Sequence, residues 1–202
     1  MTEPKPRAVL FDADGVTIIP QAPFSVQYAA AHGLDAKVLG SFFDERFGEA
    51  LIGKRDLKEL LEERRALWQW DGSMEDLLKQ WFAAENVRNE ALVTLIQQAR
   101  KNGIRCYLAT NQEKYRTQFI KESMFPGVFD KVFSSADIGV KKPDPKYYRF
   151  IIDELRRSQV ITEPGDLAYF DDQSSNVESA GKLGIRAYLY SDVSQVEKLL
   201  QL

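Results

Sequence analysis

Two acidic residues directly follow a short apolar segment near the start of the chain. In the stretch VLFDADG, the apolar residues 9–11 precede Asp12, and Asp14 and Gly15 come next. Neighbouring carboxylates beside a buried segment repel each other and lose hydration, so they need a compensating cation. One such carboxylate can act as a nucleophile, and its neighbour can donate and accept a proton. The pair therefore indicates nucleophilic and acid–base chemistry close to a cation.

Polar residues also follow other apolar segments further along the chain. They come after the segments IRCYLA, KVF and LAYF, and the loop DIGVKKPDP follows the second of these. The residues concerned are Thr110 and Asn111, then Ser134 and Ser135 with Lys141 and Lys142, and finally Asp171 and Asp172. In an open parallel sheet, ligands bind beyond the carboxyl ends of the strands. If these segments are strands of one sheet, their polar residues meet at one edge.

The side chains expected at this edge suit phosphoryl transfer assisted by a metal ion. Several carboxylates at one place cannot all stay ionised alone, and ligand sets made only of oxygen favour Mg²⁺. Thr110 can donate a hydrogen bond to a phosphate oxygen, and a lysine can neutralise the phosphate charge. Asp12 can attack phosphorus and form an aspartyl-phosphate. Asp14 can protonate the leaving oxygen and then deprotonate the water that hydrolyses the intermediate.

The apolar segments alternate with helical segments over most of the chain. Short, β-prone segments bounded by turn residues predict strands at 7–11, 104–109, 131–133, 167–170 and 186–190. Helices are expected near 89–99, 113–124, 145–157, 175–183 and 193–201. Repeated βα units with apolar strands predict an α/β fold, in which helices cover both faces of a parallel sheet.

Residues 22–86 have a different character from the rest of the chain. They show helical periodicity, several aromatic residues and dense charge, and glycines punctuate them as helix ends or turns. Ser73 is placed to cap a helix that contains Leu77 and Trp81. We therefore expect a helical domain over residues 20–87, inserted into a core formed by residues 1–19 and 88–202.

The motifs FDADG, ATNQ, VKKPDP and YFDDQSSN, taken in order, resemble the four motifs of the haloacid dehalogenase-like (HAD) hydrolase superfamily. The resemblance covers the whole chain. It implies a Rossmann-like three-layer core with a parallel sheet, and it identifies the helical insertion with the C1-type α-helical cap of that superfamily. The nearest branch contains the sugar-phosphate phosphatases and the phosphatase domain of soluble epoxide hydrolases.

The resemblance also implies roles for individual residues. Asp12 would be the nucleophile, and Asp14 would be the acid/base and contact Mg²⁺ through its backbone carbonyl. The second-motif residues Thr110 and Asn111 would bind phosphate together with Lys142. Pro143 favours Lys142 over Lys141 as the third-motif lysine, because a residue before proline is held extended. The metal ligands would come from Asp12, Asp14, Asp171 and Asp172, with Asp172 favoured over Asp171 as a direct ligand.

The implied function is a Mg²⁺-dependent phosphatase that acts on a small phosphorylated metabolite. A phosphomutase is compatible with the same residues, as is a binding protein that retains the fold without catalysis. Asp14 argues against a dehalogenase, because that branch lacks an aspartate at this position. Sugar phosphates, nucleotides, flavin mononucleotide and other phosphomonoesters remain open as substrates. Candidates for substrate contact in the insertion are Phe42, Phe43, Arg46, Lys54 and Arg55.

The composition sets limits on partners and location. The chain has 202 residues, a formal net charge of −3 and a hydrophobic content of 44%, which fit a globular protein. No basic bias suggests nucleic acid, and no apolar run is long enough to span a membrane. Cys106 is the single cysteine, so no internal disulfide can form. We expect a cytoplasmic protein, either a monomer or a homodimer.

Overall fold

A parallel sheet of five strands forms the centre of the larger part of the molecule. This computed structural model describes residues 4–202, so residues 1–3 of the predicted core lie outside the described residues. The strands are β1 (Ala8–Phe11), β2 (Arg105–Thr110), β3 (Lys131–Ser134), β4 (Leu167–Asp171) and β5 (Arg186–Leu189). Their spatial order is β3-β2-β1-β4-β5, and each neighbouring pair is parallel. The predicted α/β fold is therefore confirmed, with β1 at the centre of the sheet.

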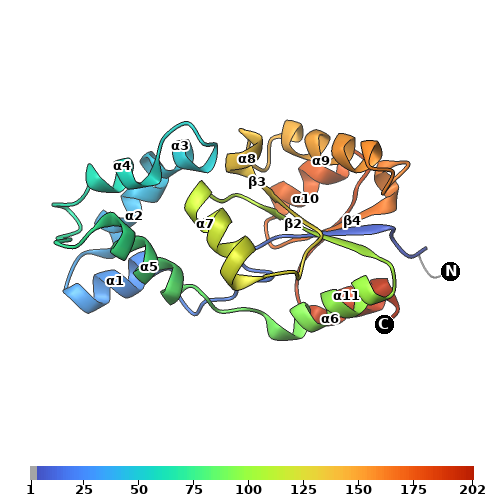
Figure 1. Cartoon of the computed structure of the whole chain (residues 1–202), viewed down its shortest axis with the longest axis horizontal. Coiled ribbons are helices and arrows are strands. Elements are labelled where there is room, and N and C mark those ends of the chain that lie inside the picture. The colour runs from blue at the N-terminus through green and yellow to red at the C-terminus, as the bar shows by residue number, and fades with distance from the viewer. Residues whose placement is uncertain (1–3) are drawn as a thin grey trace.

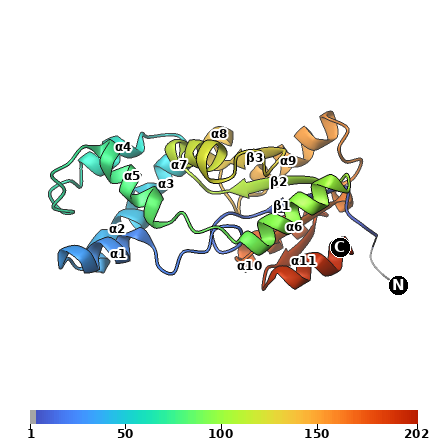
Figure 2. The same cartoon turned by 60° about the horizontal axis from the view of Figure 1, so that its bottom comes forward.

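Helices cover both faces of the sheet, as predicted (Figures 1 and 2). The alternation of side chains along β1 explains this arrangement, because Val9 and Phe11 point to one apolar cluster and Ala8 and Leu10 to another. The first cluster contains residues of α6 (Glu90–Lys101) and α11 (Val193–Leu200), and the second contains residues of α9 (Pro145–Arg157) and α10 (Ser174–Gly181). The sheet is thus the middle layer of three.

The remaining short elements connect the strands. They are α7 (Lys114–Phe119), the π-helical turn η1 (Ile120–Met124), α8 (Ser135–Ile138) and the 3₁₀ turn η2 (Pro164–Asp166). The sequence predicted one helix over 113–124, whereas the structure has α7 followed by η1. The chain widens there because the backbone N–H of Phe125 bonds to the carbonyl of Ile120, five residues earlier, at 2.9 Å.

A helical insertion of five helices follows β1. It consists of α1 (Phe24–His32), α2 (Ala36–Glu45), α3 (Phe47–Leu51), α4 (Leu57–Glu62) and α5 (Met74–Ala84). These helices share a hydrophobic cluster of their own, in which Phe42 and Trp68 are almost fully buried. Ser73 caps α5 by accepting a hydrogen bond from the backbone N–H of Asp76, as predicted. The insertion lies beside the carboxyl edge of the sheet (Figure 1).

The two connections between the helical insertion and the sheet run side by side. Ile18 and Arg88 form an antiparallel bridge, and the N–H of Ile19 bonds to the carbonyl of Val87 at 2.8 Å. The N–H of Asn89 also bonds to the carbonyl of Thr17 at 2.9 Å. These contacts support our proposal that residues 20–87 form a cap domain and residues 1–19 and 88–202 a core domain.

Candidate active site

Asp12 lies at the carboxyl end of the central strand β1, where it is buried. Its Oδ1 accepts hydrogen bonds from the backbone N–H of Ala13 at 2.6 Å and lies 2.7 Å from Nζ of Lys142. Within residues 4–202, the hydrogen-bond and ion-pair contacts of the carboxylate are made by Oδ1, so Oδ2 is open to an external ligand. The loop behind Asp12 is fixed by Thr17, whose Oγ1 donates to the Asp12 carbonyl at 3.0 Å.

Lys142 is held at the centre of the site by its side chain and by its backbone. Its Nζ lies 2.7 Å from Asp12 Oδ1 and 2.7 Å from Asp171 Oδ2, and the residue is only 3% exposed. The side-chain amide of Asn111 accepts from the Lys142 N–H at 2.8 Å and donates to the Lys142 carbonyl at 3.0 Å. Lys141 is exposed. The geometry therefore favours Lys142 as the functional lysine and gives the Asn111 side chain a role in positioning it.

The two acidic residues at the carboxyl end of β4 differ in how many hydrogen-bond donors they meet. Asp171 is fully buried and accepts hydrogen bonds from Lys142, from the Tyr169 hydroxyl, from the Gln173 N–H and from Asn176. Among the described residues, Asp172 accepts a single side-chain hydrogen bond, from Gln173 Nε2 at 3.0 Å. Because protein donors already occupy both oxygens of Asp171, Asp172 has the greater capacity to bind an external cation.

The carboxylates at the sheet edge have the spacing and chemistry of a site for a hard divalent cation. One oxygen each of Asp12, Asp171 and Asp172 lies within 4.8 Å of the others. Mg²⁺ prefers such oxygen ligands and uses few carboxylates. Gly15 makes room for Asp172, because a Cβ at position 15 would lie 2.4 Å from Asp172 Oδ2. Its φ of +81° also favours glycine. These residues fit a bound Mg²⁺.

Thr110 ends strand β2, next to β1, with its hydroxyl unpartnered. The residue is 1% exposed, and its Oγ1 has no hydrogen-bond partner in the described part of the chain. A buried polar atom without a partner costs about 1 to 3 kcal/mol, which a bound acceptor would recover. This hydroxyl is therefore suited to donate to an oxygen of a ligand that occupies the sheet edge.

The charges at the sheet edge act differently on its buried groups. Burial raises the pKa of Asp12 well above its usual value, against the opposing effect of Lys142, and Asp171 adds to the increase. Burial also disfavours the charged forms of Asp171 and Lys142. For Asp171, the attraction of Lys142 and the hydrogen bonds from Lys142, Tyr169 and Asn176 outweigh burial, and for Lys142 the attraction of Asp12 and of Asp171 outweighs it. As a result, the pKa of Asp171 is lowered and that of Lys142 is raised. A single lysine faces two buried carboxylates at equal distances, so the cluster is short of positive charge, as expected for a cation site.

Asp14 faces a cavity beside this cluster, and Gln112 orients it. Gln112 Nε2 donates to Asp14 Oδ2 at 2.6 Å. The Asp14 carboxyl is open to the cavity, but the protein atoms around it raise its pKa by desolvation, which Arg116 opposes. Ser134 and Ser135, predicted at the sheet edge, donate to the Gln112 carbonyl at 3.0 and 3.3 Å. They support the Gln112 loop rather than the cavity itself.

Gln112 and Arg116 were not predicted as site residues. The only available signal was their position, since Gln112 follows Thr110 and Asn111 directly and Arg116 lies one helical turn later. Nothing in the sequence indicates that the Gln112 side chain turns towards Asp14, which lies 98 positions away. Contacts of this kind depend on the loop conformation after β2.

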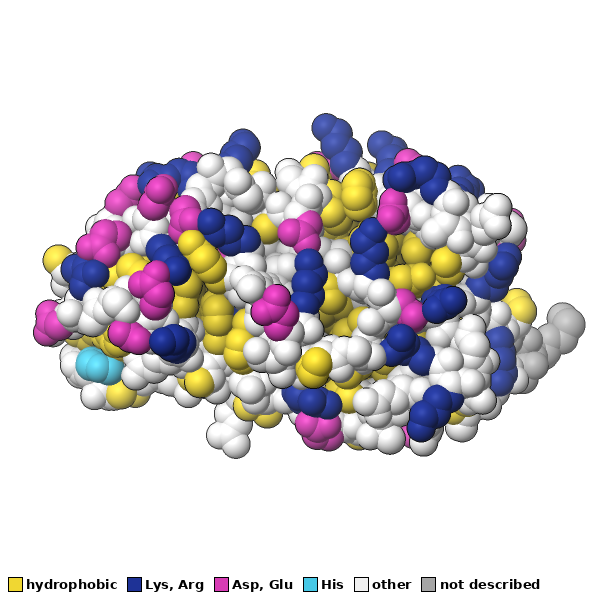
Figure 3. Space-filling model, viewed as in Figure 1, with side chains coloured by type: hydrophobic (Ala, Val, Ile, Leu, Met, Phe, Trp, Pro, Cys, Tyr) yellow, Lys and Arg dark blue, Asp and Glu magenta, His cyan; other side chains and the backbone are white. Residues whose placement is uncertain are grey.

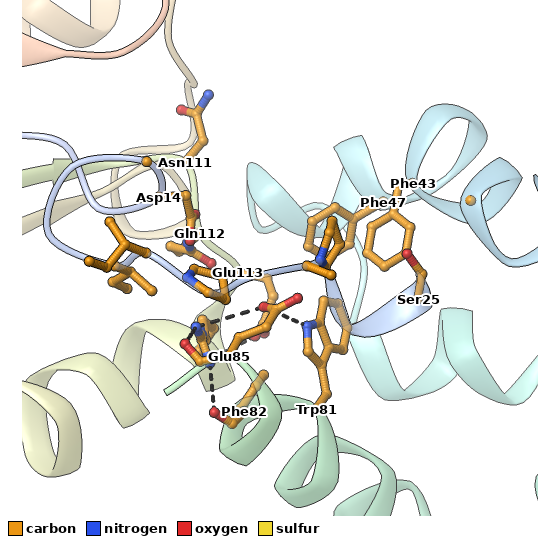
Figure 4. A pocket seen from close by; sticks show the side chains of 18 of the residues that line it. Asp14, Ser25, Phe43, Phe47, Trp81, Phe82, Glu85, Asn111, Gln112 and Glu113 are labelled. Atoms are coloured by element: carbon orange, nitrogen blue, oxygen red, sulfur yellow. Dashed lines mark hydrogen bonds and ion pairs between the residues drawn. The ribbon is translucent and has the colours of Figure 1, made fainter. Parts of the chain in front are cut away.

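The cavity has a volume of about 730 Å³ and separates the sheet edge from the helical insertion. Asp14, Asn111 and Gln112 lie on one side, and Phe43, Phe47 and Trp81 lie on the other (Figure 4). On the face seen in Figure 3, hydrophobic side chains gather between the insertion at the left and the sheet at the right. Of the insertion residues predicted to contact substrate, Phe43 lines the cavity, and the four that do not line it are Phe42, Arg46, Lys54 and Arg55.

A parallel sheet with acidic residues at its carboxyl edge and a helical insertion after its first strand defines an α/β enzyme with its site at the strand ends. Residues 6–184 match the family model described as haloacid dehalogenase-like hydrolase. Because this match covers most of the chain, the protein belongs to the haloacid dehalogenase-like hydrolase family, and the predicted resemblance is confirmed.

Individual curated relatives share little sequence identity with this chain. Rat bifunctional epoxide hydrolase 2 is 21% identical over 222 residues, which cover 96% of this chain and 38% of that protein. Phosphatase MT3486 of Mycobacterium tuberculosis is 31% identical over 96 residues, which cover 46% of this chain and 42% of that protein. The chain thus spans less than half the length of these curated relatives.

Solved structures share the fold. The HAD family enzyme BT-2542 of Bacteroides thetaiotaomicron, in complex with magnesium and inorganic phosphate, has a TM-score of 0.74 to this chain at 20% identity. The alignment covers 94% of this chain and 98% of that one. Within residues 4–202, no helix has both the length and the apolar character needed to cross a membrane.

Proposed function

We propose that the protein is a Mg²⁺-dependent phosphatase that hydrolyses a small phosphomonoester through an aspartyl-phosphate. The observation that carries this proposal is the cluster of Asp12, Asp171 and Asp172, whose ligand oxygens lie within 4.8 Å of one another, with Lys142 between the first two. The phosphatase MT3486 and the magnesium and phosphate complex of BT-2542 support the same activity. Asp12, Asp172 and the Asp14 carbonyl would hold Mg²⁺. The bound ion would neutralise the carboxylates and polarise the phosphate.

In the first step, Oδ2 of Asp12 attacks phosphorus, and the bond between phosphorus and the leaving oxygen breaks. Asp14 donates its proton to that oxygen, and its raised pKa favours the protonated form that this step needs. Lys142 and the Thr110 hydroxyl stabilise the charge on the transferring group. In the second step, water attacks the aspartyl-phosphate and gives its proton to Asp14. Asp12 is regenerated as inorganic phosphate leaves.

The test is release of inorganic phosphate from a panel of phosphomonoesters, measured with Mg²⁺ and with a chelator. We expect Mg²⁺-dependent release that Asp12→Asn reduces by on the order of 10⁴-fold or more, while circular dichroism shows an intact fold. The matched control is Asp153→Asn, an exposed aspartate on α9, which should retain wild-type activity. Activity of Asp12→Asn near the wild-type level would refute the nucleophile assignment.

A phosphomutase would give a different result in the same assay. It would return the phosphoryl group to a sugar hydroxyl, so a sugar phosphate would isomerise without net release of phosphate. Phosphorus NMR can detect this isomerisation. If a sugar phosphate isomerises and no inorganic phosphate is released, the mutase alternative replaces the phosphatase proposal.

A further inference from the structure

The cavity beside Asp14 is large enough for the whole leaving group of a small phosphomonoester. Its volume of about 730 Å³ lies within the range of sites that enclose small ligands. It reaches from Asp14 at the sheet edge to α2, α3 and α5 of the helical insertion (Figure 4). A phosphate held at the sheet edge would therefore direct its ester group into this space.

The wall of the cavity opposite Asp14 is aromatic and fixed. The ring centroids of Phe43 and Phe47 lie 5.2 Å apart, and those of Phe43 and Trp81 lie 5.4 Å apart, both edge to face. The indole N–H of Trp81 donates to Glu85 Oε2 at 2.9 Å, so it is not free for a ligand. Ile19, which is 43% exposed, adds a further apolar surface. This wall offers a ligand contact area but few hydrogen bonds.

The charged residues around the cavity do not suit a second anionic group on the substrate. Among the described residues that line it, the acidic ones are Asp14, Asp44, Glu85 and Glu113, and the basic one is Arg116. A second phosphate or a carboxylate would meet an excess of negative charge there. The charge balance therefore favours an uncharged ester group.

Arg116 is already committed to protein groups. It is 3% exposed, its guanidinium donates to the carbonyls of Phe82 and Glu85 at 3.2 and 3.3 Å, and it lies 3.7 Å from Glu85 Oε2. It also stacks over the rings of Phe82 and Phe119. To bind a ligand anion, Arg116 would have to break these contacts, so it does not supply a free anion site in the cavity.

We propose that the substrate is a phosphate monoester of an uncharged, largely apolar alcohol, whose chain or ring packs against Phe43, Phe47, Trp81 and Ile19. This inference rests on the proposed phosphatase function and narrows its substrate class. A sugar in the same place would set several hydroxyl groups against aromatic rings, and only the hydroxyl groups that reach polar lining residues such as Ser25 and Asp44 would find hydrogen-bond partners.

The experiment compares esters of primary alcohols, so that the leaving groups have similar chemistry. The apolar substrates are ethyl, butyl and hexyl phosphate. Glucose 6-phosphate and fructose 1,6-bisphosphate are the polar substrates with which they are compared. We expect kcat/KM to rise with chain length, by up to about fourfold for each methylene group buried. We also expect hexyl phosphate to exceed glucose 6-phosphate by at least about tenfold.

Two variants then test whether the apolar lining of the cavity causes the dependence of kcat/KM on chain length. Phe47→Ala and Ile19→Ser should lower kcat/KM for hexyl phosphate by about tenfold, while changing that for ethyl phosphate by less than about threefold. Ile19→Ser protects the test against a folding defect, because this side chain is exposed on a connection between the insertion and the core. The matched control is Phe150→Ala, a 40% exposed phenylalanine on α9 that does not line this cavity.

The outcomes separate the substrate class from the phosphatase function. Faster turnover of either sugar phosphate than of hexyl phosphate, or equal losses on ethyl and hexyl phosphate in both variants, would overturn the inference and leave the function intact. No release from any ester would contradict the function. In that case, calorimetry measures the binding of hexyl phosphate to Asp12→Asn and so tests the aromatic wall without turnover. The inference is overturned as well if hexyl phosphate does not bind, or if adding Phe47→Ala to this variant leaves the binding unchanged.

Discussion

The two sides of the cavity are built on different physical principles. On the sheet side, Lys142 Nζ lies 2.7 Å from a carboxylate oxygen of Asp12 and 2.7 Å from one of Asp171, and Asn111 fixes the backbone of the lysine. On the side of the helical insertion, aromatic rings meet at centroid separations of 5 to 6 Å with few directional bonds. Hydrogen bonds and ion pairs allow each group one position, whereas ring packing tolerates many exchanges.

This difference separates chemistry from selectivity. A group that must meet phosphorus or a cation needs its place defined to a fraction of an ångström, which directional bonds provide. A surface that selects an ester group needs shape and apolar area, which packing provides. Substitutions on the sheet side should therefore act on every substrate, while those on the insertion side should act on some substrates only.

Among the substitutions that change both stability and activity, the largest effect is expected for Lys142→Ala. Its loss leaves Asp12 and Asp171 buried without a partner, which should lower the free energy of unfolding in chelator by about 3 to 5 kcal/mol. Activity should fall by about 10²-fold or more on every substrate, because a charge that stabilises the transferring group is removed. Lys141→Ala, the matched control at the exposed neighbour, should change both quantities little. The reverse order of the two lysines would contradict the site assignment.

Thr110→Val should reduce activity less than Lys142→Ala and should affect stability in the opposite direction. The change keeps the shape of the side chain and removes the unpartnered hydroxyl, so metal-free stability should stay constant or rise by about 1 kcal/mol. By contrast, kcat/KM should fall roughly 10- to 100-fold on all substrates. Chemical denaturation and steady-state kinetics on the same preparations measure both. A clear loss of stability would mean that the hydroxyl already has a partner in the ligand-free protein.

Glu113 allows a buried carboxyl without a lysine partner to be compared with Asp171, and this comparison needs only a measurement of stability. This buried carboxyl caps α7 by accepting hydrogen bonds from the N–H groups of Tyr115 and Arg116, but within residues 4–202 it forms no ion pair like that between Asp171 and Lys142. Burial raises its pKa from 4.5 to about 7, although the backbone N–H groups oppose the shift. Asp171, beside Lys142, shifts in the opposite direction.

The sign of the pH effect follows from the raised pKa of Glu113. Below pH 4.5 both the folded and the unfolded states hold the proton, and between 4.5 and about 7 the unfolded state loses it first. The wild-type protein should therefore lose stability relative to Glu113→Gln as the pH rises through this window, by up to about 3 kcal/mol. Denaturant titrations at pH 5 and pH 8 measure the difference. A stability difference that does not change with pH would contradict the raised pKa.

The sequence sufficed where a local pattern determines the structure. The strand before Asp12 and the strand before Thr110 were identified from apolar segments that end in polar residues, and the parallel order of the sheet brings those ends together. The preference for Lys142 over Lys141 could also be reached from sequence, because Pro143 restricts only the residue before it. The structure then adds the contacts that fix this lysine.

The sequence did not suffice where tertiary packing decides. Arg46 and Arg55 were among the candidates for substrate contact, but neither lines the cavity, and both pair with Glu63 on the insertion. Phe42 packs into the core of the insertion, while Phe43, its neighbour, reaches the cavity. Which of two adjacent aromatic residues faces a cavity depends on how the helices of the insertion pack, and no local pattern records it.

The paired connections at Ile18 and Arg88 have a consequence for how such proteins can diversify. Because the chain leaves the sheet and returns to it at adjacent, hydrogen-bonded positions, the segment between them closes a loop whose ends already meet. Lengthening such a loop costs little in entropy, since each doubling of its length adds only about 0.6 kcal/mol. The segment between these positions can therefore be exchanged in evolution while the strand order and Asp12 are kept, and under the proposed function such an exchange would change the preferred ester.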